Sequence, residues 1–284
     1  MLQASPKLHH SFALGGFTVT QLRDGFVEHT QPHQFFGLNA TEQDFSTFSA
    51  SRNIKTDSFV FPVTVTLIEA GMHRILVDAG HGWSMQPEAG NLLASLEQAG
   101  IAPETITQVI ITHLHGDHIG GLLNAAGEPA FINAHYSINS AEIAYWTGAA
   151  ANSDMGRMAC NILGVLGDLV RGVRPGVHLL PGLQLVASPG HTPGHMCVKL
   201  DSKTKTFFIA SDLANHPVWS IAQPAWHMRL DVDREQAAKT RQRLLGQIAD
   251  EGWLMAGYHM PFPAVGRIQR DGQGFAFIAE DGQP

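Results

Sequence analysis

The sequence predicts a fold of the α/β (α+β) class, in which β-sheets with both parallel and antiparallel strands are covered by helices on their outer faces. Two features of the chain indicate this. Short apolar segments with the two-residue alternation of β-strands occur in runs, and amphipathic segments with helical spacing lie between these runs. Turn signals such as Ala70-Gly71 and Asp271-Gly272 separate some neighbouring strands, so hairpins are expected beside longer crossovers. Sheets with both kinds of connection contain antiparallel and parallel pairs.

The first half of the chain alternates strands with one helix. Residue alternation and β-branched side chains mark the strands, which are expected at 17–22, 63–68, 73–78 and 108–112. A helix is expected over 89–99, because its leucines at 92, 93 and 96 share one face and Gly100 follows as a stop signal.

The second half contains more helix. The spacing of apolar residues predicts helices over 140–146, 158–170 and 233–249, the last with Asp231 or Asp233 as its N-cap. Apolar strands are expected at 183–187, from 207 to Asp212 and from 253 to His259. A final hairpin is expected at 267–269 with 275–278.

The length of 284 residues and the lack of a low-complexity linker favour one structural domain. Within it we distinguish an N-terminal extension, 1–62, from a catalytic domain, 63–284. Nine of the 15 phenylalanines lie before residue 62. Three of them are expected in the core, namely Phe12, Phe17 and Phe61. Four others lie in a polar, loop-like stretch and are expected to form a lid or a dimer contact, namely Phe35, Phe36, Phe45 and Phe48.

Composition excludes several classes of protein. A net charge of −7 argues against a nucleic-acid partner, because phosphate binding needs a basic surface. The two cysteines, Cys160 and Cys197, lie far apart and imply no disulfide framework. The N-terminus lacks the apolar stretch of a signal peptide, and no apolar run is long enough to span a membrane. We therefore expect a cytoplasmic protein without a membrane partner.

The segment 112–121 carries the strongest functional signal. It places His113, His115, Asp117 and His118 within six positions, directly after the predicted strand 108–112. Imidazole and carboxylate groups are the ligands of zinc and similar divalent metals. Gly120 and Gly121 follow, and they would let the backbone pass close to another element.

Three more potential ligands follow apolar strands farther along the chain. His191 lies in the turn 188–195, whose two glycines and two prolines interrupt regular structure. Asp212 and His259 each end a predicted buried strand. Loops at strand ends converge on functional sites, so these side chains are candidates for the same metal centre.

The order of these motifs resembles the metallo-β-lactamase superfamily from about residue 60 onward. The resemblance also includes Leu76-Val-Asp-Ala-Gly80. It implies an αββα sandwich of two mixed sheets covered by helices, with two metal ions at one edge. It further implies that His113, His115 and His191 hold one ion, that Asp117, His118 and His259 hold the other, and that Asp212 bridges both. Asp78 would support the ligands by hydrogen bonds.

Within the superfamily the chain is similar to methyl parathion hydrolase and lactonase-like hydrolases, on stretches that include 61–65, 92–106 and 256–263. This implies a metal-bound hydroxide that attacks an uncharged ester, lactone or phosphotriester, with zinc as the expected metal and manganese, iron or cobalt as alternatives. Acyl-homoserine lactonases place a tyrosine three residues after the bridging aspartate, whereas this chain has Asn215 there. Three alternatives stay open: an iron-dependent, persulfide dioxygenase-like enzyme, a β-lactam hydrolase, and a binding module.

Two residues are expected to act in catalysis beside the metals. Asp117 would pass a proton to the leaving group, and His216 would contact the substrate. His195 is expected to have a structural or supporting role. The tryptophans at 146, 219 and 226, with the phenylalanine-rich segment, favour an apolar, uncharged small molecule as the partner. The resemblance also implies a homodimer.

Overall fold

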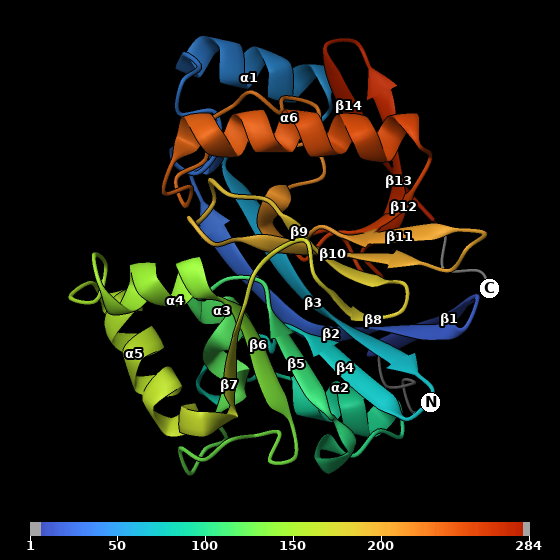
Figure 1. Cartoon of the computed structure of the whole chain (residues 1–284). Helices are drawn as coiled ribbons and strands as arrows, with labels where there is room; N and C mark the ends of the chain where they lie inside the picture. Colours follow the sequence, from blue (N-terminus) through green and yellow to red (C-terminus); the bar gives the residue numbers. More distant parts are fainter. Residues whose placement is uncertain (1–6, 281–284) are drawn as a thin grey trace, which may run out of the picture.

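The computed structural model describes residues 7–280, which form four layers with two β-sheets in the middle (Figure 1). The predicted fold class is therefore confirmed. The first sheet has, in spatial order, β1 (His9–Leu14), β2 (Phe17–Thr30), β3 (Ser58–Ala70), β4 (His73–Val77), β5 (Gln108–Ile111), β6 (His135–Asn139) and β7 (Val170–Val173). Neighbouring strands are antiparallel from β1 to β4 and parallel from β4 to β7, so the sheet is mixed.

The second sheet is also mixed, since β11 pairs with β12 in parallel and its other neighbours pair antiparallel. In spatial order it has β14 (Gly274–Ala279), β13 (Val265–Asp271), β12 (Leu254–Ala256), β11 (Thr206–Ile209), β10 (Met196–Asp201), β9 (Leu183–Ala187) and β8 (His178–Leu180).

Helices cover the outer faces of both sheets. The helices are α1 (Glu42–Ser51), α2 (Leu92–Gln98), α3 (Gly116–Ile119), α4 (Ser140–Thr147), α5 (Asp154–Leu166) and α6 (Arg234–Asp250). In Figure 1, α6 lies over the second sheet, and α2, α4 and α5 lie on the far side of the first. No helix among residues 7–280 is long and apolar enough to cross a bilayer.

Strand alternation explains the layers. On β4 and β5, Ile75, Val77 and Ile110 are buried against the second sheet. The residues between and beside them, Leu76 and Val109, pack instead with the apolar faces of α2 and α5. Successive side chains of a strand point to opposite faces, so a strand that is apolar throughout builds two cores.

Two predicted helices have different bounds in the structure. The helix expected over 89–99 is α2, which begins at Leu92, because Gly90 has a φ of 79° and the Asp24 carboxylate accepts a hydrogen bond from the Leu92 N–H. The helix expected over 158–170 is α5, which begins four residues earlier. Ser153 caps it, and it ends before Gly167, which has a φ of 47°.

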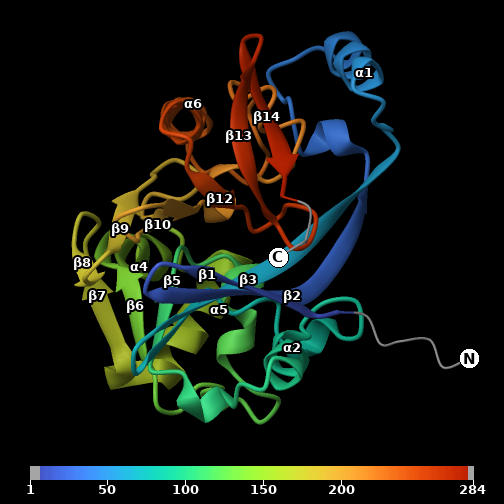
Figure 2. The same cartoon turned by 90° about the vertical axis from the view of Figure 1, so that its right-hand side faces the viewer.

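The phenylalanine-rich stretch differs from the expectation more strongly. Phe45 and Phe48 lie on α1 and not in a loop, and Thr41 caps this helix by accepting a hydrogen bond from the Asp44 N–H. Residues 9–30 form β1 and β2 of the first sheet, and the expected boundary at residue 62 falls within β3. The long strands β2 and β3 extend out of the sheet toward α1 (Figure 2).

Candidate metal centre

The predicted ligands lie together at one edge of the sandwich, where loops leave the carboxyl ends of several strands. The segment that carries His113, His115, Asp117 and His118 follows β5, and the turn with His191 joins β9 to β10. Asp212 lies in a short 3₁₀ helix after β11, and His259 follows β12. The candidate ligands therefore come from loops of both sheets.

The first group consists of His113, His115, His191 and Asp212, all buried. His115 Nδ1 lies 3.0 Å from both His113 Nε2 and His191 Nε2, and these two nitrogens are 3.2 Å apart. Asp212 Oδ2 lies 3.2 Å from His191 Nε2 and 4.0 Å from His113 Nε2. Ligands of a tetrahedral zinc ion are separated by roughly 3.3 Å when the bonds are near 2.0 Å, so the spacing fits such an ion.

The second group consists of Asp117, His118 and His259. Asp117 Oδ2 lies 3.6 Å from His118 Nε2 and 3.5 Å from His259 Nε2. The other oxygen of Asp212, Oδ1, faces this group at 3.1 Å from His118 Nε2 and 3.4 Å from His259 Nε2. Asp212 thus lies between the two groups and presents one oxygen to each.

The hydrogen-bonding state of these rings fits metal ligation. His191 Nδ1 lies 2.9 Å from Asp231 Oδ1, His118 Nδ1 lies 2.8 Å from Asp78 Oδ2, and His259 Nδ1 lies 2.9 Å from Pro62 O. Each outer nitrogen faces an acceptor and so carries the proton, which leaves a lone pair on each Nε2. Among residues 7–280, His118 Nε2 and Asp212 Oδ1 are buried without a hydrogen-bond partner, as expected of groups that bind a cation.

Asp78 supports the second group, as the sequence suggested. Besides the contact with His118, its carboxylate accepts hydrogen bonds from the Thr112 backbone N–H and hydroxyl, each at 2.8 Å. Tyr258, which the sequence did not indicate, stacks on His118 with ring centroids 4.0 Å apart and donates its hydroxyl proton to Asp117 O at 2.7 Å. The predicted close approach of backbone also occurs: a Cβ on Gly121 would lie 1.9 Å from Ala79 O.

Asp231 and Arg241 support His191 from behind. Asp231 Oδ1 contacts His191, and its Oδ2 accepts a hydrogen bond from Arg241 Nη2 at 2.9 Å. Arg241 is 1% exposed and also donates to three backbone carbonyl groups. The sequence offered Asp231 as a possible N-cap of α6, but that cap is Asp233.

Glu142 on α4 is a buried carboxylate that sequence reasoning missed. Its Oε1 accepts hydrogen bonds from the Leu114 N–H at 3.0 Å and from Trp146 Nε1 at 2.6 Å. Its Oε2 accepts from the Thr192 hydroxyl at 2.7 Å and from the Gly194 N–H at 2.9 Å. One side chain therefore joins the loop after β5 to the turn that carries His191.

Burial and the neighbouring carboxylates shift the pKa values of the histidines in opposite directions. Burial lowers the pKa of His115 to about 3, so its ring is neutral, as metal ligation requires. For His191, burial acts in the same direction, but Asp212 and then Asp231 outweigh it and raise the pKa to about 9. Burial also opposes ionisation of Asp212, whereas His259 and His118 hold the pKa of this carboxyl well below its usual range. A cation at the centre would take the place of the protons that these carboxylates favour.

His195 and His216 are not members of the two ligand groups, and each has its own hydrogen-bond partners. His195 Nδ1 faces Ser188 Oγ at 2.7 Å, and its Nε2 accepts a hydrogen bond from the Asp212 N–H at 3.3 Å, so the ring positions the backbone of Asp212. His216 Nδ1 accepts from the Val218 and Trp219 N–H groups, each at 3.2 Å. Its ring stacks on Trp219 with centroids 4.1 Å apart. A contact of His216 with substrate stays a prediction.

A small apolar cavity, about 10 Å³ in volume, lies beside the metal-ligand cluster. Its walls are Phe35, Phe36, Phe61, Asn215, Met228 and Leu230. Phe61 contacts His259 with ring centroids 4.6 Å apart, and Asn215 donates to Asp212 Oδ2 at 2.6 Å. Three of these lining residues, Phe36, Phe61 and Met228, also belong to a buried hydrophobic cluster with Phe45, Phe59 and Trp219. The predicted apolar surroundings of the site are therefore present.

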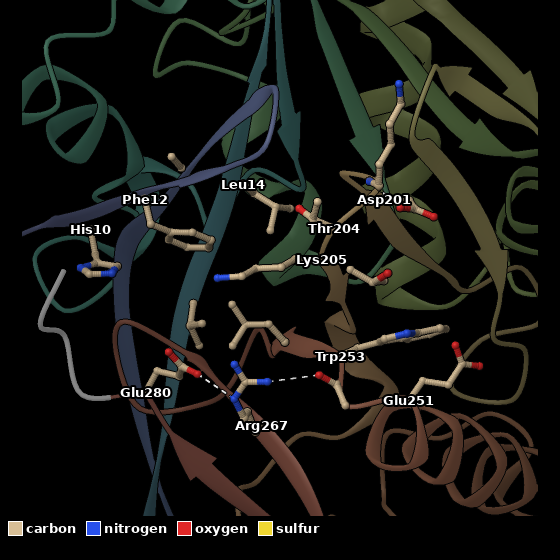
Figure 3. Close-up of a pocket in the computed structure, with 16 residues that line it drawn as sticks. His10, Phe12, Leu14, Asp201, Thr204, Lys205, Glu251, Trp253, Arg267 and Glu280 are labelled. Atoms are coloured by element: carbon tan, nitrogen blue, oxygen red, sulfur yellow. Dashed lines mark hydrogen bonds and ion pairs between the residues drawn. The ribbon is translucent and has the colours of Figure 1, made fainter.

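A larger cavity of about 640 Å³ lies away from this chemistry (Figure 3). It is lined by the end of β1, the turn between β10 and β11 and the beginning of β12, whereas the ligands follow the opposite ends of β11 and β12. Arg267, which lines it, is paired with Glu280 at 2.9 Å and donates to Gly252 O at 3.2 Å. We place the functional site at the ligand cluster because the reactive side chains converge there.

Comparison with known families agrees with this placement. Residues 59–259 match the family model described as the metallo-beta-lactamase superfamily. The chain belongs to the metallo-β-lactamase superfamily. All seven predicted ligands, from His113 to His259, lie within the matched residues.

Two relatives with curated descriptions are similar to this chain in sequence. It is 30% identical over 223 residues to metallo-beta-lactamase domain-containing protein 1 of Xenopus laevis, covering 76% of this chain and 78% of that one. It is also 30% identical over 116 residues to an N-acyl homoserine lactonase of a Bacillus species, a match that spans only 41% of either chain.

Solved structures share the superfamily fold over nearly the whole chain. AidC, described as a dizinc quorum-quenching lactonase, matches with a TM-score of 0.89 and 24% identity over 97% of this chain and 99% of that one. AbOPH, described as a hydrolase in the beta lactamase superfamily, matches with a TM-score of 0.87 and 20% identity over 98% and 99%. At these identities the likeness shows the fold.

Proposed function

We propose that this protein is a two-metal hydrolase of uncharged esters or lactones. The observation that carries the proposal is the position of Asp212, which presents one carboxylate oxygen to three histidines and the other to His118 and His259. Bridging carboxylates of this kind hold two divalent ions close together. Zinc suits the imidazole-rich ligand set, and the ligands would be His113, His115 and His191 for one ion and Asp117, His118 and His259 for the other.

Two such ions would supply Lewis acidity toward the substrate carbonyl and lower the pKa of water to roughly 7. The protein's own residues would fix the geometry. Asp78, Asp231 and Glu142 hold the ligand rings and loops in place. Asp117 is the most open of the carboxylates in the cluster, with 25% of its side chain exposed against 2% for Asp212, and we assign it the proton that the leaving oxygen receives.

The adjoining cavity supports the substrate class. Five of its six lining residues are apolar, and the sixth, Asn215, is uncharged. An uncharged ester or lactone with apolar substituents suits this lining. The N-acyl homoserine lactonase among the relatives and the dizinc lactonase among the structures agree with this class.

A substrate panel tests the proposal. The zinc-loaded and manganese-loaded protein should be assayed against acyl lactones, aryl esters, phosphotriesters and a β-lactam, and the iron-loaded protein against a persulfide with oxygen uptake as readout. We expect ester or lactone hydrolysis to be fastest and to increase with tail length, since each buried methylene contributes about 0.8 kcal/mol. Turnover confined to the β-lactam, or oxygen uptake with the persulfide, would show that the protein has another activity.

A further inference from the structure

The cavity of about 640 Å³ that lies away from the metal ligands has the size of a small-molecule site (Figure 3). Such sites typically measure roughly 300–1,000 Å³. Both sheets form the cavity, since it is lined by β1 of the first sheet and by the turn between β10 and β11 and the beginning of β12 of the second. Phe12 of β1 packs edge-on against Phe207 of β11, with ring centroids 5.4 Å apart, and so joins the two sheets at the cavity.

Four apolar side chains line this cavity. They are Phe12 and Leu14 from β1, Leu254 from β12 and Val265 from β13. Leu14 and Val265 are buried in the hydrophobic cluster between the sheets, whereas Phe12 and Leu254 are only partly buried and pack against that cluster. A ligand that covers Phe12 and Leu254 would therefore remove apolar surface from water, which favours binding.

Lys205 brings a free ammonium group to these apolar side chains. In Figure 3 its side chain extends between Phe12 and Arg267, and its Nζ lies on the side of Phe12. Within residues 7–280 this Nζ has no hydrogen bond or ion pair, since the hydrogen bonds of Lys205 are those of its backbone with Ser202. An ammonium group can donate three hydrogen bonds, so Lys205 can bind an anionic group of a ligand.

The acidic residues of the cavity do not neutralise this ammonium group. Each of them already accepts a hydrogen bond, namely Glu280 from Arg267 at 2.9 Å, Glu251 from Gln247 at 3.0 Å and Asp201 from the Lys203 backbone N–H at 2.9 Å. In Figure 3, Asp201 and Glu251 lie on the opposite side of the cavity from Lys205 Nζ. The charge that is open to a ligand beside Phe12 is therefore positive.

We propose that this cavity is a second, non-catalytic binding site for a monocarboxylate with an apolar chain. The carboxylate accepts hydrogen bonds from Lys205 Nζ, and the chain covers Phe12 and Leu254. A single negative charge is favoured over a polyanion, because Asp201, Glu251 and Glu280 would repel further negative charge. The inference does not rest on the proposed hydrolase function, since no metal ligand lines the cavity.

Sodium octanoate serves as the probe, and calorimetric titration into the zinc-loaded wild type measures its affinity. We expect octanoate to bind at least about tenfold more tightly than butyrate, because its longer chain buries more methylene groups against the apolar side chains. 1-Octanol has a chain of the same length without the charge, and it should bind at least about fivefold more weakly than octanoate. Added sodium chloride should weaken the binding of octanoate, because it screens the ammonium group.

Variants of Lys205 assign the binding to the cavity. Lys205 is exposed and holds its turn through backbone groups, so its side chain can be replaced without loss of the fold. Lys205→Gln should raise the Kd of octanoate about fivefold or more and leave the Kd of 1-octanol within about twofold of wild type. Lys205→Arg keeps the charge and should stay within about threefold for octanoate. Lys239→Gln, which replaces an exposed lysine of α6 outside the cavity, should keep the wild-type Kd for both probes.

The titrations also separate this cavity from the metal centre, where a carboxylate can bind to the ions. Octanoate held only by the metal ions would bind equally well to wild type and Lys205→Gln, and that result would overturn the proposal. The proposal also fails if octanoate does not bind, or if octanoate and 1-octanol bind with equal affinity. None of these outcomes affects the proposed hydrolase function, which is tested by the turnover of esters and lactones.

Discussion

Replacing Asp231 with asparagine should weaken the binding of one metal ion and leave the binding of the other unchanged. Asp231 joins His191 Nδ1 to Arg241 Nη2, with both contacts at 2.9 Å. Both neighbours donate, so both carboxylate oxygens are needed as acceptors. An asparagine has one oxygen and one NH₂ group, and whichever way it turns, its NH₂ group faces a donor.

The expected magnitudes follow from these contacts. Loss of a carboxylate that orients a metal-binding histidine typically reduces metal affinity by about 10–100-fold. Breaking a buried ion pair costs about 3–5 kcal/mol, and we expect the lower end here because Arg241 keeps three bonds to backbone carbonyl groups. The affinity loss should be confined to the ion of the group that contains His191.

Zinc titration against a competing chelator measures both sites, and urea unfolding measures the loss of stability. Asp233→Asn is a matched control two residues along the chain, because Asp233 only caps α6 through the Gln236 N–H and asparagine caps equally well. Wild-type affinity at both sites in a folded Asp231→Asn protein would refute this account of His191. An equal loss at both sites would refute the assignment of His191 to one group.

Two further variants test the supports of the site. Glu142→Gln should lower the free energy of unfolding by about 2–4 kcal/mol, because the new NH₂ group would face two of the four donors that Glu142 now accepts from. Urea unfolding measures this loss. As a control, Glu97→Gln on α2 should keep the free energy of unfolding within about 0.5 kcal/mol of wild type. His216→Gln should reduce the sensitivity to acid. Burial lowers the pKa of His216 to about 3, so between pH 6.5 and 3 the unfolded chain binds a proton that the folded chain does not, and wild type loses stability as the pH falls. Unfolding at pH 7 and pH 5 should differ less in the variant, by at most about 2 kcal/mol, and an unchanged pH dependence would contradict the neutral state of this ring.

The elements that the sequence predicted well are those whose pattern is local. β4, β5 and β9 were expected because their apolar and β-branched runs are continuous, and α6 because it has a long helical period and a capping aspartate. Helix α1 also has a local signal at its start, the Thr41 cap with Asp44 three residues later. The edge strands β1, β7 and β8 are short or mixed in polarity and depend on pairing with distant segments, which no local pattern records.

The site residues also fall into those that the sequence predicts and those that it does not. The seven metal-binding candidates could be predicted because their residue types are unusual after buried strands and their order resembles a known family. The residues that hold these candidates in place could not be predicted. Glu142 looks like an ordinary helix residue, and its acceptor role becomes visible only when Leu114 and Gly194, 28 and 52 positions away, are brought beside it.

Elemental analysis of the wild type and of Asp212→Ala tests the central claim most directly, because Asp212 presents a carboxylate oxygen to each of the two ligand groups. We expect about two equivalents of zinc-like metal in wild type, and one or fewer in Asp212→Ala, with nearly all activity lost. Asp201→Ala, which removes an exposed carboxylate at the end of β10, should retain both ions. Two full equivalents in Asp212→Ala, or a single iron in wild type, would contradict the account.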